Sequence, residues 1–344
     1  MIILNDVPLS AYSTMRLGGK AAFLAEANTR EDLVDAATWA KRRNLPLMVI
    51  GEGSNIVWTD GGFSGLVIVN KILGFEIFEE DHENIYLTVG AGETWDDVVE
   101  RSVNEGWSGI EQLSLIPGKA GATPIQNVGA YGREIADVLT SIEAYDTVES
   151  KFVNIPASEC DFGYRTSRFK TRDKDRFLIS SVTYHLTRMP PPPPYYPSLQ
   201  KYLEDNTIKE VTPAIIRNGV ISIRTSKLPD PKLVANCGSF FANPIIDRDE
   251  ATNLRLNFPD CVIWELDSGR SKVSAAWLIE HAGFKDYHDK DTGMGTWPKQ
   301  PLVLINESAQ STAQLINFRD QSIAAVKEKF DIKLEQEPEI LPAS

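Results

Sequence analysis

The segment NCGSFFANP, residues 236–244, places one serine between a glycine and two phenylalanines. The hydroxyl of Ser239 could take part in proton transfer, but Gly-Ser pairs are frequent in tight turns and paired phenylalanines are ordinary core residues. A lone Gly-Ser pair is not a catalytic motif. A catalytic role for Ser239 therefore depends on what the rest of the chain supplies.

The cysteines and histidines form neither a disulfide pattern nor a metal-binding pattern. The cysteines have no CxxC spacing and cannot all pair, so we expect reduced thiols; they are Cys160, Cys237 and Cys261. The histidines form no HxxxH or HExxH cluster, so no metal site is predicted; they are His82, His185, His281 and His288. No histidine is near Cys237 in the sequence, and we interpret it as a small buried residue. Catalysis must then use hydroxyls, carboxylates, arginines or a bound organic cofactor.

Glycines cluster in three loops that could approach such a cofactor. The loops are GEGSN at 51–55, GAG at 90–92 and LIPGKAGATPIQNVGAYG at 115–132. Neither the GxGxxG fingerprint nor the GxxxxGK[ST] loop is present, which argues against a Rossmann domain and a P-loop. Small residues let the backbone approach a flat or phosphorylated group, and successive amides can bind an anion. The alternative is a long ordered surface loop, although a loop of this size usually has a function.

Composition limits the partners and the compartment. The chain has 344 residues, which predicts two or three domains, and its 42% hydrophobic content is typical of a soluble globular protein. A net charge of -13 argues against nucleic acid and anionic membranes, but a small anionic ligand needs only a local basic pocket. The apolar runs are strand-length, and residues 1–15 lack the features of a secretory signal. We therefore expect a cytoplasmic protein.

The first part of the chain predicts alternating helices and strands. Thr29 is the expected N-cap of a helix with Asp32 at the capping-box position, and Thr94 and Asp97 repeat that pattern. Strands are expected in LPLMVIG, GLVIVN and IYLTVGAG. Residues 141–186 are richer in strands, namely SIEAYDTV, KFVNIP and RFLISSVTYHL, which indicates an α+β region.

A run of five prolines, residues 190–194, predicts a domain boundary because it can enter neither a helix interior nor a central strand. Helices are expected afterwards in TPAIIRNGV, where Thr212 and Pro213 form the start, in SKVSAAWLIEHAGFKD and in STAQLINFRDQSIAAVKEKF. The acidic tail EQEPEILPAS is by default expected to be frayed.

Five segments in order resemble a known family. They are GEGSN, LIPGKAGATPIQNVGAYG, FGYRTSRFK, RTSKLPDP with NCGSFFANP, and the terminal EPE, and the match as a whole runs from about Ser13 to Glu339. The chain resembles the MurB family of UDP-N-acetylenolpyruvoylglucosamine reductases. The resemblance implies an α+β fold, with a two-subdomain FAD-binding module of the vanillyl-alcohol-oxidase type and a C-terminal α+β substrate-binding domain. The expected parts are FAD-binding subdomains at 1–70 and 71–189, a proline-rich linker with a tyrosine lid at 190–211, and a substrate-binding domain with a catalytic tail at 212–344.

The resemblance also implies a reaction. NADPH would reduce FAD, and reduced FAD would transfer a hydride to UDP-N-acetylglucosamine enolpyruvate, giving UDP-N-acetylmuramate for peptidoglycan synthesis. Ser239 matches the residue that protonates the resulting carbanion-like carbon, and Arg165 matches the arginine that holds the substrate carboxylate. Glu339 matches the third catalytic position, with Glu337 as its competitor because LEQEPE is longer than the expected LEPE.

The resemblance assigns further residues to ligands. The residues matched to FAD are Gly51, Glu52, Gly53, Ser54, Asn55, Ile56, Pro117, Gly118, Gly121, Ala122, Thr123, Gln126, Asn127, Gly129, Ala130 and Tyr131. The residues matched to the UDP-sugar are Tyr196 on the lid, Lys227, Asn243, Lys272 and Lys285. From periodicity alone, Lys272 and Lys285 could equally be solvated helix charges.

Two alternatives stay open. An oxidase of the same flavin fold would keep the glycine loops but has no need of YR, GSFF and EPE together. A non-catalytic UDP-sugar-binding protein should have lost one of the three reactive residues, whereas Arg165, Ser239 and Glu339 are all present.

Overall fold

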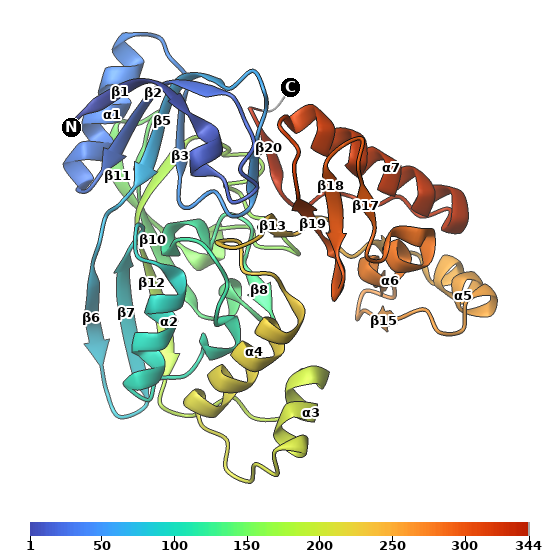
Figure 1. Ribbon diagram of the computed structural model, residues 1–344. Helices are drawn as coiled ribbons and strands as arrows, with labels where there is room; N and C mark the ends of the chain where they lie inside the picture. The colour runs from blue at the N-terminus through green and yellow to red at the C-terminus, as the bar shows by residue number, and fades with distance from the viewer. Residues whose placement is uncertain (343–344) are drawn as a thin grey trace. The chain divides into compact units, whose positions relative to one another are not determined.

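The computed structural model describes residues 1–342, and the chain forms two compact units (Figure 1). The first unit comprises Met1–Val7, Ala21–Glu52 and Ser64–Ser226, and the second comprises Pro8–Lys20, Gly53–Phe63 and Lys227–Ser344. The units are therefore interleaved along the chain. The last two residues of the expected substrate-binding domain, Ala343 and Ser344, lie outside the described part.

One sheet near the N-terminus carries the first predicted glycine loop. Its order is β1-β2-β5-β3, formed by Ile3–Pro8, Lys20–Ala27, Phe63–Asn70 and Leu47–Ile50 respectively. Helix α1 (Arg30–Arg42) begins as predicted, because Thr29 accepts a hydrogen bond from the amide of Asp32 in a complete capping box. Strand β3 runs parallel to β5 and ends directly before the loop at Gly51.

A second sheet of the first unit is antiparallel and follows the order β11-β10-β12-β7-β6. Its strands are Lys151–Pro156, Leu139–Asp146, Phe177–Thr187, Asn84–Gly90 and Phe75–Glu80 respectively. The strand-rich region was predicted correctly, whereas β6 was missed because FEIFEE is mostly exposed. The predicted capping box of α2 (Trp95–Asn104) is wrong: Thr94 makes no side-chain cap, and its hydroxyl accepts a hydrogen bond from Lys119 Nζ at 3.0 Å.

Two helices follow the proline run, which itself forms neither helix nor strand. They are α3 (Pro197–Asp205) and α4 (Pro213–Lys227). The predicted start of α4 is confirmed, since Thr212 Oγ1 accepts a hydrogen bond from Ile215 N at 3.3 Å. Gly219 on α4 allows close packing with α3, because a Cβ there would lie 2.8 Å from the ring of Tyr202.

The second unit contains a four-stranded sheet in the order β13-β19-β18-β17. Its strands are Ala235–Ser239, Gln300–Asn306, Met294–Trp297 and His288–Asp289 respectively. A smaller sheet, β14-β16-β15, is formed by Ile245–Ile246, Ser271–Val273 and Ile263–Glu265. Helices of this unit include α5 (Arg248–Asn257) and α7 (Thr312–Phe330), the latter capped by Ser311.

The helix predicted in SKVSAAWLIEHAGFKD is shorter than expected. Its first three residues form strand β16, and α6 spans only Ala275–Ile279, continued by a π-helical turn at Glu280–Phe284. Ser274 caps α6 by accepting a hydrogen bond from Trp277 N at 3.2 Å. Gly283 ends the turn with φ at 95°, a conformation that glycine adopts readily.

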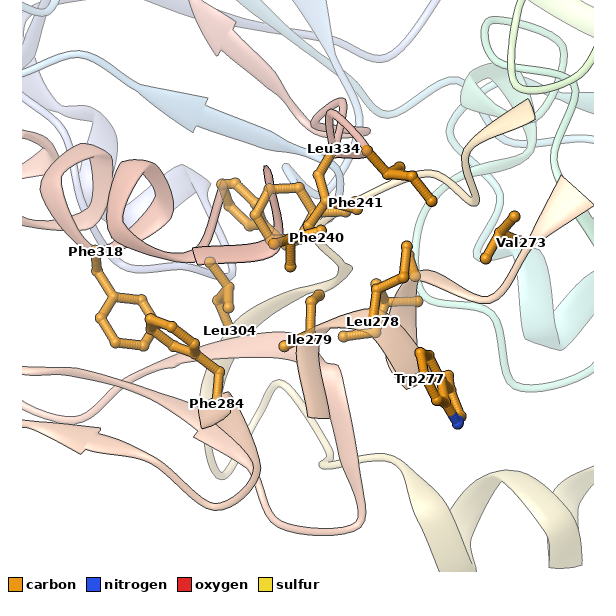
Figure 2. Packing of buried hydrophobic residues seen from close by; sticks show 14 of the residues in the cluster. Phe240, Phe241, Val273, Trp277, Leu278, Ile279, Phe284, Leu304, Phe318 and Leu334 are labelled. Atoms are coloured by element: carbon orange, nitrogen blue, oxygen red, sulfur yellow. The ribbon is translucent and has the colours of Figure 1, made fainter. Parts of the chain in front are cut away.

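The paired phenylalanines after Ser239 are core residues, as their type suggests. Phe240 is fully buried and Phe241 is 1% exposed, with ring centroids 5.4 Å apart. Figure 2 shows both rings among Leu278, Leu304 and Leu334. Truncating a buried phenylalanine to alanine costs about 3–5 kcal/mol of stability. These side chains therefore anchor the backbone that carries Ser239.

The C-terminal tail is ordered through residue 341, contrary to the default for termini. Glu337 N donates a hydrogen bond to Phe240 O at 2.9 Å, and Ala242 N donates to Glu335 O at 2.9 Å. Strand β20 (Glu339–Leu341) then pairs in parallel with β4 (Ile56–Trp58). Two successive backbone pairings thus hold the tail within the second unit.

Candidate active site

Ser239 lies at the end of β13, beyond a bulge. Asn236 pairs with Ile305 and Ser239 with Val303, so the bulged strand has one more residue than its partner. Gly238 adopts φ at 76°, and its amide donates a hydrogen bond to the buried Asn236 Oδ1 at 2.9 Å. Ser239 itself is partly exposed, between this bulge and the buried Phe240. The structure therefore gives Ser239 a rigid backbone and an accessible side chain, unlike a buried turn residue.

The two candidate glutamates occupy different places on the tail. Glu337 lies opposite Phe240, and its charge adds to burial in raising the pKa of the Cys237 thiol. Glu339 pairs with Ile56, and its amide donates a hydrogen bond to Asn55 O at 3.1 Å. Glu337 is thus beside the Ser239 segment, while Glu339 is beside the GEGSN segment. Both side chains are partly exposed.

Arg165 lies in a tight turn of the first unit. The turn is closed by reciprocal backbone hydrogen bonds between Gly163 and Thr166, at 3.1 and 3.3 Å, and Arg165 has φ at 55°. Its Nη2 donates to Gly129 O at 2.7 Å, and its guanidinium lies 5.2 Å from the ring centroid of Tyr164. A non-glycine residue at φ above zero is uncommon and often marks a functional position. The contact fixes the guanidinium on the long glycine loop, residues 115–132.

Two segments matched to FAD contact each other inside the first unit. A Cβ on Gly51 would lie 3.0 Å from Lys119 Cγ, so the loop after β3 packs closely on the longer glycine loop. Lys119 Nζ also pairs with Glu52 Oε1 at 3.2 Å. The remaining matched residues of the first segment, from Gly53 to Ile56, belong to the second unit.

The long glycine loop is held by its own side chains. The amide of Asn127 donates to Glu134 Oε2 at 2.7 Å and to Gly163 O at 3.2 Å, so both its amide hydrogens are used. Thr123 Oγ1 donates to Ala120 O at 2.8 Å and also contacts the Tyr184 hydroxyl. A Cβ on Gly121 would lie 2.4 Å from Ala91 Cβ, so only glycine fits there. Asn127 and Thr123 thus shape the loop.

The residues present fit a flavin nucleotide. The loop has positive φ at Leu115, Gly118, Asn127 and Tyr131, which turns its amides in unusual directions. Backbone amides in such turns suit a diphosphate, and small side chains suit a flat ring. The buried Gln112 Oε1 has no hydrogen-bond partner among residues 1–342, while Gln112 Nε2 donates to Tyr131 O at 3.2 Å. An unpaired buried acceptor at this loop is what a ligand donor would satisfy.

The residues matched to the UDP-sugar differ in their surroundings. Tyr196, directly before α3, is 42% exposed, and its ring makes an edge contact with Tyr131 at 5.6 Å between centroids. Lys227 ends α4, and its carbonyl accepts a hydrogen bond from Trp297 Nε1 at 3.0 Å. Neither contact uses the polar end of Tyr196 or Lys227.

The other three residues of this group lie, like Lys227, in the second unit. Asn243 Oδ1 accepts a hydrogen bond from Ala275 N at 2.9 Å, so its carbonyl supports the start of α6. Lys272 is on β16, with its amine 5.6 Å from the Trp264 ring centroid. Lys285 pairs with Glu280 at 2.6 Å. Lys272 is therefore on a strand and not on a helix.

Sequence reasoning missed an ion pair that supports the long glycine loop. Arg217 on α4 binds Asp96 on α2 through two hydrogen bonds, of 2.6 and 3.0 Å, and Leu115 N donates to Asp96 Oδ1 at 2.5 Å. Burial opposes ionisation of Asp96, but Arg217 and the Leu115 amide outweigh it and hold its pKa below the ordinary value. The partners are 121 residues apart, and no local pattern links them.

The three thiols are buried and free, which confirms the expectation of reduced cysteines. Burial raises the pKa of Cys160 and of Cys261 to about 11, and it raises that of Cys237 as well. A thiol that stays protonated is a poor nucleophile. Within residues 1–342, no helix has both the length and the apolar character needed to span a bilayer.

Comparison with known proteins identifies the domains and the fold of the chain. A family model described as an FAD binding domain matches residues 21–154, and one described as the UDP-N-acetylenolpyruvoylglucosamine reductase C-terminal domain matches residues 230–341. The fold is also that of a solved MurB from Thermus caldophilus, with a TM-score of 0.68 at 22% identity, over 99% of this chain and all of that one. The expected α+β fold, with an FAD-binding module of the vanillyl-alcohol-oxidase type before a C-terminal domain, is thereby confirmed.

Two curated relatives are similar over nearly their full length. The UDP-N-acetylenolpyruvoylglucosamine reductase of Alcanivorax borkumensis is 38% identical over 340 residues, 98% of this chain and 96% of the relative. That of Ralstonia nicotianae is 38% identical over 337 residues, 97% of this chain and 98% of the relative. The chain belongs to the UDP-N-acetylenolpyruvoylglucosamine reductase family.

Proposed function

We propose that the protein catalyses the NADPH-dependent, FAD-mediated reduction of UDP-N-acetylglucosamine enolpyruvate to UDP-N-acetylmuramate, in peptidoglycan precursor synthesis. The observation that carries the proposal is family membership over almost the whole chain, with 38% identity across 98% of it. Neither nucleic acid nor a membrane is required as a partner. We also propose a cytoplasmic location and a functional division into cofactor-binding residues 1–189, a lid segment 190–211 and substrate-binding residues 212–344.

The reaction requires control of negative charge and of one proton. When bound, FAD supplies the hydride that it has received from NADPH. Hydride addition leaves negative charge on the carbon next to the substrate carboxylate, and that charge must be stabilised and then quenched. The proposed residues of this chain perform these two tasks.

Ser239 Oγ is the proposed proton donor to that carbon. A neutral hydroxyl is a weak acid, but the carbanion-like carbon is strongly basic, so the transfer is favourable when the oxygen is held in place. The bulge at Gly238 and the buried Phe240 fix the backbone on both sides of Ser239. This rigidity supports the assignment because a proton donor must be prealigned.

Arg165 is proposed to hold the substrate carboxylate and stabilise the charge spreading into it. A guanidinium stays protonated and offers parallel donors to a carboxylate. The hydrogen bond from Nη2 to Gly129 O orients the group before the substrate arrives. Preorganised donors of this kind are a large source of transition-state stabilisation.

Glu339 is the proposed third catalytic residue, with Glu337 as the alternative. Glu339 is favoured by its pairing beside Ile56, at the segment proposed to bind FAD. Glu337 is favoured by its position opposite Phe240, next to Ser239. Their separate surroundings allow each to be replaced without changing the other.

Cofactor and substrate are assigned to separate sets of residues. Backbone groups of 51–56 and 117–131 would hold FAD, and Gln126 is retained as a side-chain donor or acceptor. The UDP-sugar would be bound by Tyr196, Lys227, Asn243, Lys272 and Lys285. Lysines near a diphosphate would also attract an anionic substrate to a chain of net charge -13.

The deciding experiment is anaerobic stopped-flow absorbance at the flavin band. The purified protein is reduced with NADPH and then mixed with UDP-N-acetylglucosamine enolpyruvate. Rapid reoxidation without oxygen is the expected result. Flavin that stays reduced until air is admitted would favour the oxidase, and a protein that lacks a flavin band would favour the non-catalytic binding protein.

A further inference from the structure

Arg224 is a partly buried cation that forms no salt bridge with a carboxylate of residues 1–342. It lies on α4, seven residues after Arg217, and its guanidinium interacts with the hydroxyl of Tyr131. Burial lowers the pKa of Arg224, and the attraction of Tyr131 and the more distant Asp96 offsets this only in part. Its Nε is buried, and no atom of residues 1–342 is placed to accept the hydrogen it carries.

The contrast with Arg217 on the same helix is informative. Arg217 makes two short hydrogen bonds to Asp96 and a longer contact with Glu100 at 3.6 Å. Desolvating a guanidinium is costly unless a counterion or a full set of acceptors replaces water. The neutral phenol of Tyr131 compensates for little of this desolvation cost. Arg224 is therefore prepared for an anion that the first unit does not itself supply.

A second unpaired group lies at the same tyrosine. Gln112 Nε2 donates to Tyr131 O at 3.2 Å, while Gln112 Oε1 is buried without a partner within the described residues. Burial also raises the pKa of Tyr131, so its hydroxyl is neutral and able to donate. Buried polar groups are almost always paired in native proteins, so two unpaired groups beside one residue indicate a missing ligand.

We propose that Arg224 and Tyr131 form a binding subsite for a phosphate oxygen of a nucleotide diphosphate. The inference rests on the proposed function, in which both FAD and the UDP-sugar carry that group. Lys227 follows Arg224 by three residues on α4, a spacing that puts two cations on one helix face. Tyr131 contacts the ring of Tyr196, so the subsite is next to the proposed lid. The motif RTSKLPDP contains Arg224, but sequence reasoning selected only its lysine.

The test uses the holoenzyme with Arg224→Gln, which removes the charge and keeps most of the side chain. Two dissociation constants are measured: that of FAD, by flavin release, and that of UDP-N-acetylglucosamine enolpyruvate, by perturbation of the oxidised flavin band without NADPH. One of them should rise about 10- to 100-fold, as expected for a charge-assisted hydrogen bond. A rise for FAD assigns the subsite to the cofactor diphosphate, and a rise for the substrate assigns it to the UDP diphosphate.

Two controls separate binding from folding. Lys201→Gln removes an exposed cation that pairs only with Asp205 in the described structure, and it should change neither constant. Arg224→Lys restores the charge and should recover part of the lost affinity. Tyr131→Phe, which keeps the ring against Tyr196, is the second variant and should weaken the same ligand to a smaller degree. If Arg224→Gln behaves like Lys201→Gln, or if its loss is shared equally by both ligands and lysine restores nothing, the subsite is wrong.

The outcome for the subsite is distinct from that for the proposed function. A wild-type protein that oxidises its flavin with the substrate, together with an unaffected Arg224→Gln, overturns the subsite alone. A wild-type protein without flavin or without substrate binding overturns the function first.

Discussion

The two compact units hold their proposed reactive residues in different ways. In the first unit, side chains do the holding: Arg165 Nη2 binds Gly129 O, and Arg217 binds Asp96, which in turn accepts from Leu115 N. In the second unit, the backbone does it. Phe240 N donates to Leu302 O at 2.8 Å, Glu337 N to Phe240 O at 2.9 Å, and Glu339 N to Asn55 O at 3.1 Å.

The difference predicts how each unit responds to substitution. A side chain that hangs from a backbone-paired strand can be replaced without moving its neighbours. A side chain that itself makes the stabilising hydrogen bond cannot be replaced in this way, because its removal leaves a buried partner unpaired. Replacing a reactive side chain of the second unit should therefore lower activity without lowering stability. Replacing a side chain that holds the first unit together should lower both.

Ser239→Ala should give the largest effect and should be purely chemical. Loss of a general acid lowers the rate of product formation about 10²- to 10⁴-fold, whereas flavin reduction by NADPH should be unchanged. Anaerobic stopped-flow of the two half-reactions separates these rates. A variant that reduces the substrate normally would make the serine structural, and one that unfolds would contradict the backbone-held description of its strand.

Arg217→Ala should be the most damaging substitution for stability. Removing one partner of a largely buried ion pair costs about 3–5 kcal/mol, because Asp96 is left without its counterion. Lys201→Ala, which breaks an exposed pair, should cost less than about 0.5 kcal/mol. Urea unfolding of the holoenzyme measures both. Equal effects for the two variants, which both lie in the first unit, would contradict a stabilising role for the Arg217–Asp96 pair.

Glu339→Gln and Glu337→Gln form a matched pair on one tail. Loss of the catalytic carboxylate should lower kcat about 10- to 100-fold, the value of one charge-assisted interaction, while the other variant stays near wild type. Both proteins should stay folded, because the backbone hydrogen bonds of Glu337 and Glu339 are kept. We expect the loss in Glu339→Gln; a loss in Glu337→Gln alone would transfer the role to the residue opposite Phe240.

The smallest effect is expected for the ion pair between Asp146 and Arg176 in the first unit, which should make stability depend on pH in acid. Three hydrogen bonds from Nε and Nη2 of Arg176, together with amide donors, hold the pKa of the buried Asp146 below its ordinary value. This stability is fully present above the unfolded pKa of about 3.9 and is lost as pH falls through the lower, folded value. Asp146→Asn should therefore be less stable than wild type at pH 7 and closer to it at pH 3. An unchanged difference at the two values would exclude a contribution from this carboxylate.

Local signals predicted much of this molecule. The capping box at Thr29 and the start of α4 at Thr212 were read correctly because they depend on neighbours a few residues apart. The order of the glycine loops and reactive segments identified the family. Thr94 shows the limit of the same reasoning: its cap was predicted from Asp97, but Lys119 takes its hydroxyl instead.

Features that depend on distant segments were missed. Nothing near Asp96 in the sequence indicates Arg217, and nothing near Arg224 indicates that its neighbours leave it without a counterion. For the tail, local sequence offers only the default of a frayed terminus; the resemblance, which implies a catalytic tail, indicated order, and the pairing partner β4 is some 280 positions away in the chain. Composition and periodicity carry no information about which charges a fold will bury together.

The pairing of β20 with β4 also sets an order in time. The first unit ends at Ser226, so all of its segments have been synthesised before most of the second unit exists. The second unit needs β4 from the beginning of the chain and Glu339–Leu341 from its end. This pairing cannot form until Glu339–Leu341 has been synthesised. A chain truncated before Glu337 would therefore contain every segment of the first unit and lack both candidate glutamates.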